Sequence, residues 1–222
     1  LADSIPLLKL LEEEGVDAFD IDAGCYETLD YIFPPSYLGE SCMSYVTEEA
    51  RKAVKVPLLN AGTHNPDTAL ELLESGNVDL VMMGRALIAD PELPNKLMEG
   101  RREDVRPCLR CNENCIGRIW NRHTKLGCSI NVQAMEEERF RLEKTDSPKE
   151  VVVIGGGPGG MEAARVAALI GHKVTLLERS EKLGGVMGEI CTAKFKKNIK
   201  ELTKWYLVQL QKLGVDVRLN TA

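Results

Sequence analysis

The chain has 222 residues, and its 28 basic and 34 acidic side chains give a net charge of -6. This mildly acidic balance argues against nucleic acid or an anionic membrane as the main partner, because both favour basic surfaces. No apolar run approaches the roughly 18 residues that span a bilayer, and seven unevenly placed cysteines do not suit a secreted disulfide framework. We therefore expect a cytoplasmic protein with no nucleic-acid partner and no membrane partner.

Helix and strand patterns alternate through the first hundred residues. Helices are expected over residues 5–15, 47–54 and 65–76, the last with Asn65 as its cap and Pro66 at its first position. Apolar strands are expected over residues 17–24, 56–62 and 78–85. Repeated αβ units of this kind predict a parallel sheet covered by helices. Periodicity alone leaves open an open doubly wound sheet or a slice of a (β/α) barrel.

A different pattern starts at residue 150, after a charged stretch over residues 132–149 that we interpret as a linker. The segment "VVVIGGGPGGMEAARVAALIGHKVTLLER" predicts a strand, a glycine turn, a helix and a second strand. Its G-x-G-x-x-G spacing lets backbone N–H groups approach a pyrophosphate at a helix N-terminus, and an acid about 20 residues on suits a ribose hydroxyl. A glycine turn of a non-binding α/β domain is the alternative. The candidate dinucleotide-binding residues are Gly155, Gly157, Pro158, Gly159, Gly160 and Glu178.

Four cysteines crowd into the stretch between these two patterns, with the spacing C-x2-C-x3-C-x12-C. Structural zinc sites usually contain two C-x2-C pairs, whereas three close cysteines and one distant cysteine suit a cubane iron–sulfur cluster. Zinc and unrelated buried thiols remain as alternatives, and Cys25, Cys42 and Cys191 have no such grouping. The candidate metal ligands are Cys108, Cys111, Cys115 and Cys128.

Taken together, these segments resemble a known family. The strands "VPLLNAG" and "VDLVMMGR", the cysteine motif and "VVVIGGGPGGMEAAR" follow one another as in the iron–sulfur branch of the Old Yellow Enzyme flavoproteins. That branch includes 2,4-dienoyl-CoA reductase, 2-enoate reductase and trimethylamine dehydrogenase. The resemblance covers essentially the whole chain. It implies a (β/α)8 barrel that holds FMN, a [4Fe-4S] cluster, and a module for FAD and a nicotinamide dinucleotide.

The resemblance also implies a division of this α/β chain. Residues 1–105 would be the last three βα units of the FMN-binding barrel, and residues 106–131 the cluster segment. After the linker, residues 150–222 would be the N-terminal part of a Rossmann-like FAD-binding domain. Neither chain end looks like a natural domain terminus, so we expect an internal piece of a longer polypeptide that is inactive by itself.

Cofactor contacts follow from the same resemblance. In this family the FMN phosphate is bound at the carboxyl ends of the last two barrel strands, where barrel phosphate sites lie. The stretch "LERSEKLGG" after the acidic residue favours FAD over NAD in the second half. The positions implied for FMN are Ala61, Gly62, Gly84 and Arg85, and those added for FAD are Arg179 and Gly185. For Arg85, a surface charge at a helix start is the alternative.

The loop after the first expected strand holds four of the chain's five tyrosines. A loop in this place faces the active site of a barrel, so we expect an aromatic wall. Dienoyl-CoA reductases typically carry a histidine where this chain has Tyr26, and "DAGCYE" looks closer to the enoate reductase branch. Tyr26, the candidate catalytic residue, either donates a proton to substrate or only shapes the pocket. His64 is expected in a solvated loop, with contact to the flavin as the alternative.

The activity implied by the resemblance is NAD(P)H-dependent reduction of an activated C=C bond in a small molecule, an enoate, enoyl thioester or enone. A cluster that carries one electron at a time would relay electrons from FAD to FMN. An amine dehydrogenase is a second hypothesis, because aromatic cages bind methylated ammonium groups. A non-catalytic electron-transfer fragment is the third, and a homo-oligomer is an open expectation.

Overall fold

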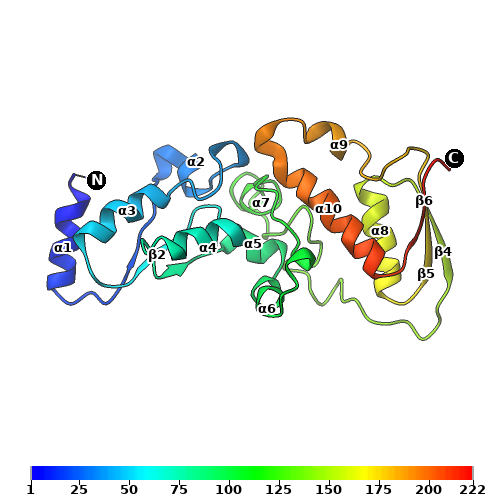
Figure 1. The fold of residues 1–222 in the computed structure, drawn as a ribbon, viewed down its shortest axis with the longest axis horizontal. Coiled ribbons are helices and arrows are strands. Elements are labelled where there is room, and N and C mark those ends of the chain that lie inside the picture. Colours follow the sequence, from blue (N-terminus) through cyan, green and yellow to red (C-terminus); the bar gives the residue numbers. More distant parts are fainter. Residues whose placement is uncertain (1, 222) are drawn as a thin grey trace. The chain divides into compact units, whose positions relative to one another are not determined.

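The computed structural model of the protein describes residues 2–221, which form two compact units. The first contains residues 2–88 and 110–124, and the second contains residues 89–109 and 125–221. Each unit has its own three-stranded parallel sheet with helices between the strands (Figure 1). The prediction of an α/β chain is therefore confirmed for both units.

The first unit is built on a short sheet with the strand order β1-β2-β3. Helices alternate with its strands, so that all three strands run in the same direction. Phe19 lies opposite Leu58, and Leu59 lies opposite Leu80. The elements are α1 (Ser4–Glu13), β1 (Phe19–Asp20), α3 (Ser44–Ala53), β2 (Leu58–Asn60), α4 (Pro66–Glu74), β3 (Leu80–Val81) and α5 (Gly84–Ala89).

Local sequence signals explain where these elements begin and end. The Asn65 side chain accepts hydrogen bonds from the N–H groups of Asp67 and Thr68, with Pro66 at the first helical position, as predicted. The strands are shorter than expected. The chain leaves β2 for the left-handed region at Gly62 (φ 129°) and turns into helix α5 at Gly84, so the ladder stops early.

Two segments of the first unit contain short helices that periodicity did not predict. One is the tyrosine-rich loop after β1, and the other is the middle of the cysteine segment. Both are too short to show a helical repeat in sequence. They contain η1 (Tyr26–Thr28), α2 (Leu29–Ile32), η2 (Ser36–Leu38) and α7 (Ile116–Trp120).

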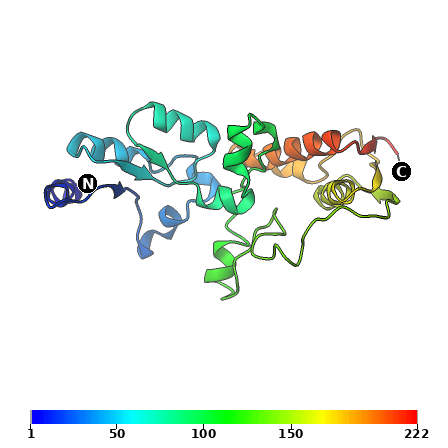
Figure 2. The ribbon, with the colours of Figure 1, turned by 90° about the horizontal axis from the view of Figure 1, so that it is seen from below.

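The second unit has the strand order β4-β5-β6, with all strands parallel. Helices α8 and α10 lie on one face of this sheet (Figure 1), and Figure 2 shows α8 end-on with α10 running across it. Residues 132–149, interpreted as a linker, contain neither helix nor strand. The elements are α6 (Leu93–Met98), η3 (Arg102–Asp104), β4 (Glu150–Ile154), α8 (Pro158–Leu169), β5 (Lys173–Leu177), α9 (Met187–Ile190), η4 (Lys194–Lys196), α10 (Lys197–Lys212) and β6 (Asp216–Arg218).

The core of the second unit lies between these helices and the sheet. Met161 of α8, Leu176 of β5 and Leu210 of α10 are among its fully buried side chains. On the other face of the sheet Ile154 is 84% exposed. Within residues 2–221 we find no helix with the length and apolar character needed to cross a bilayer.

Candidate functional site

The glycine turn of the second unit connects β4 to α8 with very little space. A Cβ on Gly160 would lie 1.8 Å from the carbonyl oxygen of Gly155, so only glycine allows the helix to start this close to the turn. A Cβ on Gly157 or Gly159, in contrast, would meet no atom within 4 Å. Gly157 is the cap of α8 and provides no capping side chain, so the helix start presents backbone N–H groups to open space. These features fit a bound pyrophosphate.

Glu178 follows β5 and holds this turn in place. Its Oε2 accepts the N–H of Gly156 at 2.6 Å, and its Oε1 accepts the N–H of Ser180 at 2.8 Å and the Ser180 hydroxyl. Hydrogen bonds from the Ser180 hydroxyl, the Ser180 N–H and the Gly156 N–H lower the pKa of Glu178 to about 2. A carboxylate has about four acceptor positions, so this charged group has room for one more donor. A ribose hydroxyl fits that description.

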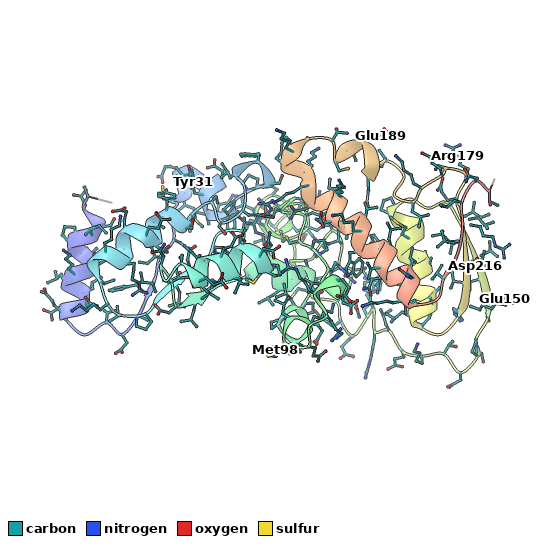
Figure 3. All side chains as sticks on the ribbon, viewed as in Figure 1. Tyr31, Met98, Glu150, Arg179, Glu189 and Asp216 are labelled. Atoms are coloured by element: carbon teal, nitrogen blue, oxygen red, sulfur yellow. The ribbon has the colours of Figure 1, made fainter. Side chains whose placement is uncertain are left out.

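The other residues predicted for this site divide into two groups. The loop at Gly184 and Gly185 folds onto the turn, because Gly184 N–H donates to the Gly156 carbonyl at 2.8 Å. A Cβ on Gly185 would lie 3.2 Å from the Cα of Gly157. Arg179 instead is exposed just beyond the end of β5 (Figure 3). The structure therefore brings Gly185 to the turn but leaves Arg179 at the surface.

The hydrogen bonds of Glu178 lead to a pH prediction. Because its folded pKa of about 2 lies below the ordinary value of 4.5, the stability from this carboxylate is fully present above about pH 4.5. It is lost as the pH falls through 2. We expect Glu178→Gln to have a lower unfolding free energy than wild type at pH 5. This difference in unfolding free energy should shrink as the pH falls. Urea unfolding between pH 5 and 2.5 measures this, with the exposed Glu181→Gln as control. A wild-type-to-variant difference that stays constant with pH would contradict the assignment.

The carboxyl ends of the strands in the first unit form the second candidate site. Strands β1, β2 and β3 are adjacent and parallel, so their carboxyl ends lie at the same end of the sheet. The loop that contains Tyr26 and the glycines Gly62 and Gly84 all follow these strand ends. The N–H of Ala61 donates to Asp22 Oδ1 at 3.0 Å and so connects two strand ends. A Cβ on Gly62 would lie 3.2 Å from the Met43 side chain.

Arg85 connects three segments of the first unit. Its Nη1 donates to the Pro34 carbonyl at 2.8 Å and to Asn112 Oδ1 at 2.6 Å, and Asn112 Nδ2 donates to the Phe33 carbonyl at 2.8 Å. Arg85 is half-buried and lies in the first turn of α5. Only one of its nitrogens takes part in these bonds, and Arg85 has further donors for an anion.

A buried polar chain at the same strand ends was missed by sequence reasoning. His64 is only 5% exposed, so the expectation of a solvated loop histidine is wrong. Asn60 Nδ2 donates to the Ile21 carbonyl at 2.6 Å, which leaves Asn60 Oδ1 to accept His64 Nε2–H at 3.1 Å. His64 Nδ1 then accepts the Ser41 hydroxyl at 2.8 Å. Burial lowers the pKa of His64, which favours this neutral form.

Tyr26 lies in an aromatic group that includes a residue from the cysteine segment. Its ring is 76% exposed, and its centroid is 6.0 Å from that of Trp120 in α7. Phe33 meets the same tryptophan edge-on at 6.1 Å. Tyr37 and Tyr45 are exposed, and Figure 3 shows Tyr31 on the same tyrosine-rich loop. The signal for Trp120 was available, because it is one of only two tryptophans in the chain.

The four candidate metal ligands are divided between the units. Cys111 and Cys115 belong to the first unit, and Cys108 and Cys128 belong to the second. Cys111 is exposed and the other three are half-buried. Within the part of the chain that the structure describes, no three His, Cys, Asp or Glu side chains group closely enough to hold a metal ion. The cluster therefore stays a prediction based on donor chemistry, since four closely spaced thiolates suit a cubane cluster.

The backbone around Cys111 and Cys115 is fixed within the first unit. Arg110 is buried, with φ 52°, and its Nη1 donates to the Gly39 carbonyl at 2.7 Å. The N–H of Gly117 donates to the Asn112 carbonyl at 2.8 Å, and a Cβ on Gly117 would lie 2.7 Å from that oxygen. A tight turn therefore carries this cysteine pair.

The first unit thus offers candidate anion contacts at the carboxyl ends of its parallel strands, and the second offers a candidate dinucleotide turn. Two family models match the chain. Residues 2–104 match the NADH:flavin oxidoreductase / NADH oxidase family, and residues 114–222 match the pyridine nucleotide-disulphide oxidoreductases. The chain belongs to the Old Yellow Enzyme-type iron–sulfur flavoenzymes, the family of the 2,4-dienoyl-CoA reductases.

Individual relatives agree with this family. The chain is 39% identical to the cinnamate reductase of Clostridium sporogenes, across 100% of this chain and 33% of the relative. A solved 2-naphthoyl-CoA reductase complex with 2-naphthoyl-CoA has a TM-score of 0.89 at 30% identity, covering 98% of this chain and 33% of the other. Histamine dehydrogenase from Rhizobium sp. 4-9 has a TM-score of 0.86 at 26% identity, covering 99% and 32%. The chain spans about a third of the length of these relatives.

Proposed function

We propose that this chain is part of an NAD(P)H-dependent flavin and iron–sulfur oxidoreductase that reduces an activated C=C bond. The substrate would be an enoate, an enoyl thioester or an enone. The supporting observation is that Tyr26, Gly62, Gly84 and Arg85 all follow the same edge of the β1-β2-β3 sheet. A candidate proton donor and the candidate phosphate contacts therefore follow the carboxyl ends of the same three strands. The named reductases among the relatives support the same reaction class.

The finer fold assignment is part of this proposal. The three strands of the first unit would be the last three of a (β/α)8 barrel, and residues 150–222 would begin a Rossmann-like FAD-binding domain. Residues 106–131 would be the cluster segment and residues 132–149 a linker. Parallel strands alternating with helices and a glycine turn at a strand end support this division.

The roles of the anion-binding residues follow from their chemistry. At the first unit, the backbone N–H groups of Gly62 and Gly84 and the guanidinium of Arg85 would hold the FMN phosphate. The N–H of Ala61 is bonded to Asp22, so Ala61 would order the strand end rather than donate directly. At the second unit, Gly157, Gly159 and the start of α8 would hold the FAD pyrophosphate. Glu178 would accept a ribose hydroxyl.

The four cysteines would bind the [4Fe-4S] cluster as thiolates. When bound, the two flavins and the cluster supply electron transfer in the order FAD, cluster and FMN, with NAD(P)H as donor. The residues of this chain bind and orient these groups. A cytoplasmic location and a homo-oligomeric state complete the proposal, with no nucleic-acid or membrane partner.

Tyr26 is the residue we propose to provide the proton for the substrate carbon next to the activating carbonyl. Its exposed ring lies beside Trp120, which would leave the hydroxyl accessible to a substrate. The alternative role, a wall of the pocket, uses the same ring without the hydroxyl. Phenylalanine at this position separates the two roles because it keeps the ring.

We expect Tyr26→Phe in the cofactor-loaded, full-length protein to lower kcat for cinnamate reduction about 100-fold or more with little change in KM. Anaerobic stopped-flow and steady-state assays with NADH and NADPH measure this, and the exposed Tyr37→Phe is the matched control. An unchanged kcat in Tyr26→Phe would leave only the wall role. A wild-type protein that reduces neither cinnamate nor an enoyl thioester would reject the proposed function itself.

Oxidation of an amine is a second candidate function. Tyr26, Phe33 and Trp120 form an aromatic group of the kind that attracts cationic amines. The likeness to histamine dehydrogenase supports this reading. Anaerobic bleaching of the flavin absorbance by methylated amines, without reduction by NADH or NADPH, would favour it over alkene reduction.

A further inference from the structure

Arg106 connects the two ends of the cysteine segment inside the second unit. It lies two residues before Cys108, and its Nη1 donates to the carbonyl of Ile130, two residues after Cys128, at 2.9 Å. Its backbone N–H donates to Asp90 Oδ2 at 2.7 Å. One side chain therefore fixes the spacing between the chain before the first cysteine and the chain after the last.

Trp205 of α10 supports the Arg106 guanidinium. The Cζ of Arg106 lies 4.7 Å from the centroid of the Trp205 ring, which is only 5% exposed. Trp205 Nε1 donates to the Asp104 carbonyl at 2.9 Å, so the ring itself is held in place. Arg165 also approaches this ring, at 5.4 Å, but its charge is paired with Glu162.

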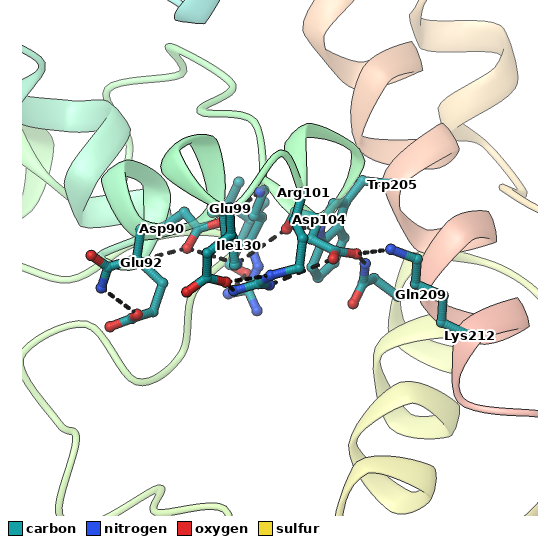
Figure 4. A network of polar contacts seen from close by, with 12 residues as sticks. Asp90, Glu92, Glu99, Arg101, Asp104, Ile130, Trp205, Gln209 and Lys212 are labelled. Atoms are coloured by element: carbon teal, nitrogen blue, oxygen red, sulfur yellow. Dashed lines mark hydrogen bonds and ion pairs between the residues drawn. The ribbon is translucent and has the colours of Figure 1, made fainter.

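Further side chains of α10 bind the segment that leads to Cys108. Asn198 Nδ2 donates to the Cys108 carbonyl at 2.7 Å. Gln209 Nε2 and Lys212 Nζ both contact Asp104 Oδ1 at 2.8 Å (Figure 4). With Trp205, these residues are spaced by seven, four and three positions, which places them on one side of a helix. Side chains along α10 therefore hold the segment from Asp104 to Cys108 in place.

The Arg106 guanidinium has a buried donor, Nε, that its neighbours do not use. This nitrogen has no hydrogen-bond partner among the described residues. A buried donor without a partner is unfavourable, and in native structures it often marks a place where another group binds. Thiolate and sulfide sulfurs of iron–sulfur clusters accept such N–H groups, and these bonds are among the factors that set cluster potentials.

We propose that Arg106 is a positioning residue for the cluster: it fixes the chain before Cys108 relative to the chain after Cys128 and places a buried positive charge between these two segments. This inference rests on the proposed cluster. Uptake of one electron adds one negative charge to the cluster and neither makes nor breaks a bond at Arg106. A fixed cation nearby stabilises the reduced state and so raises the reduction potential.

The test compares three variants of the full-length protein by iron content, FAD content and EPR-monitored redox titration. Arg106→Gln keeps much of the length but removes the charge, and we expect a lower midpoint potential or a loss of bound iron. Arg106→Lys keeps the charge and is expected to fall between Arg106→Gln and wild type. Arg141→Gln removes an exposed arginine of the same unit and is expected to match wild type in all three measurements.

The outcomes separate the positioning role from other roles. Wild-type iron and potential in Arg106→Gln would overturn the proposal, and so would equal shifts in Arg106→Gln and Arg106→Lys. Joint loss of iron and FAD in both variants would make Arg106 a general folding residue and also overturn it. A wild-type protein with zinc and no iron would reject the cluster itself, independently of Arg106.

Discussion

Gly160→Ala is expected to abolish FAD binding and to destabilise the second unit. The new Cβ would lie 1.8 Å from the Gly155 carbonyl oxygen, which is a backbone atom and has no rotamer to move into. Helix α8 would have to move away from the turn. Overpacking in a well-packed region costs about 1–3 kcal/mol of stability. We expect a clash with a backbone atom to cost as much as the upper end of this range or more. Thermal unfolding and FAD content of the purified protein measure both effects.

Gly159→Ala is the matched variant, because its Cβ meets no protein atom within 4 Å. We expect this change to leave the melting temperature unchanged or slightly higher, since alanine favours a helix. It should nevertheless weaken FAD binding if the pyrophosphate lies over Gly159. Normal FAD content in Gly159→Ala would show that the open space beside α8 is not the pyrophosphate site. Gly188→Ala, in helix α9 and also without a clash, controls for a change of glycine to alanine in a helix.

Cys111→Ser is expected to remove essentially all of the iron–sulfur cluster. A serine hydroxyl is a poor replacement for a thiolate, and loss of one of four ligands leaves one iron open to solvent. Anaerobic purification should therefore yield protein with iron near background, whose visible spectrum has lost the broad cluster band and retains the flavin bands. The glycine turn should stay folded and keep its FAD, because Cys111 is an exposed residue of the other unit.

Cys25→Ser is the control for this change, since Cys25 is also exposed but lies outside the C-x2-C-x3-C-x12-C motif. It is expected to retain full iron content. Stoichiometric zinc without iron in the wild-type protein would contradict the cluster, as would an unchanged iron content in Cys111→Ser. The first result would favour a structural zinc site and the second a different set of ligands.

Local features of this protein were readable from its sequence. The alternation of helix and strand, the cap formed by Asn65 and Pro66, and the glycine turn before α8 all depend on residues close together in the chain. The family was also readable, because its motifs are short segments in a fixed order. Each of these signals reflects a backbone requirement, such as the close contact at Gly160, that neighbouring residues meet by themselves.

Only the tertiary structure decided which side chains meet across long stretches of chain. His64 Nδ1 accepts the hydroxyl of Ser41, 23 residues earlier, and this bond offsets part of the cost of burying the ring. Trp120 reaches Tyr26, 94 residues earlier in the chain, and Arg106 reaches Trp205, 99 residues later. No periodicity or spacing rule encodes such pairs, because they depend on how separate helices and strands pack. The burial and charge of these groups, and hence their chemistry, follow from that packing.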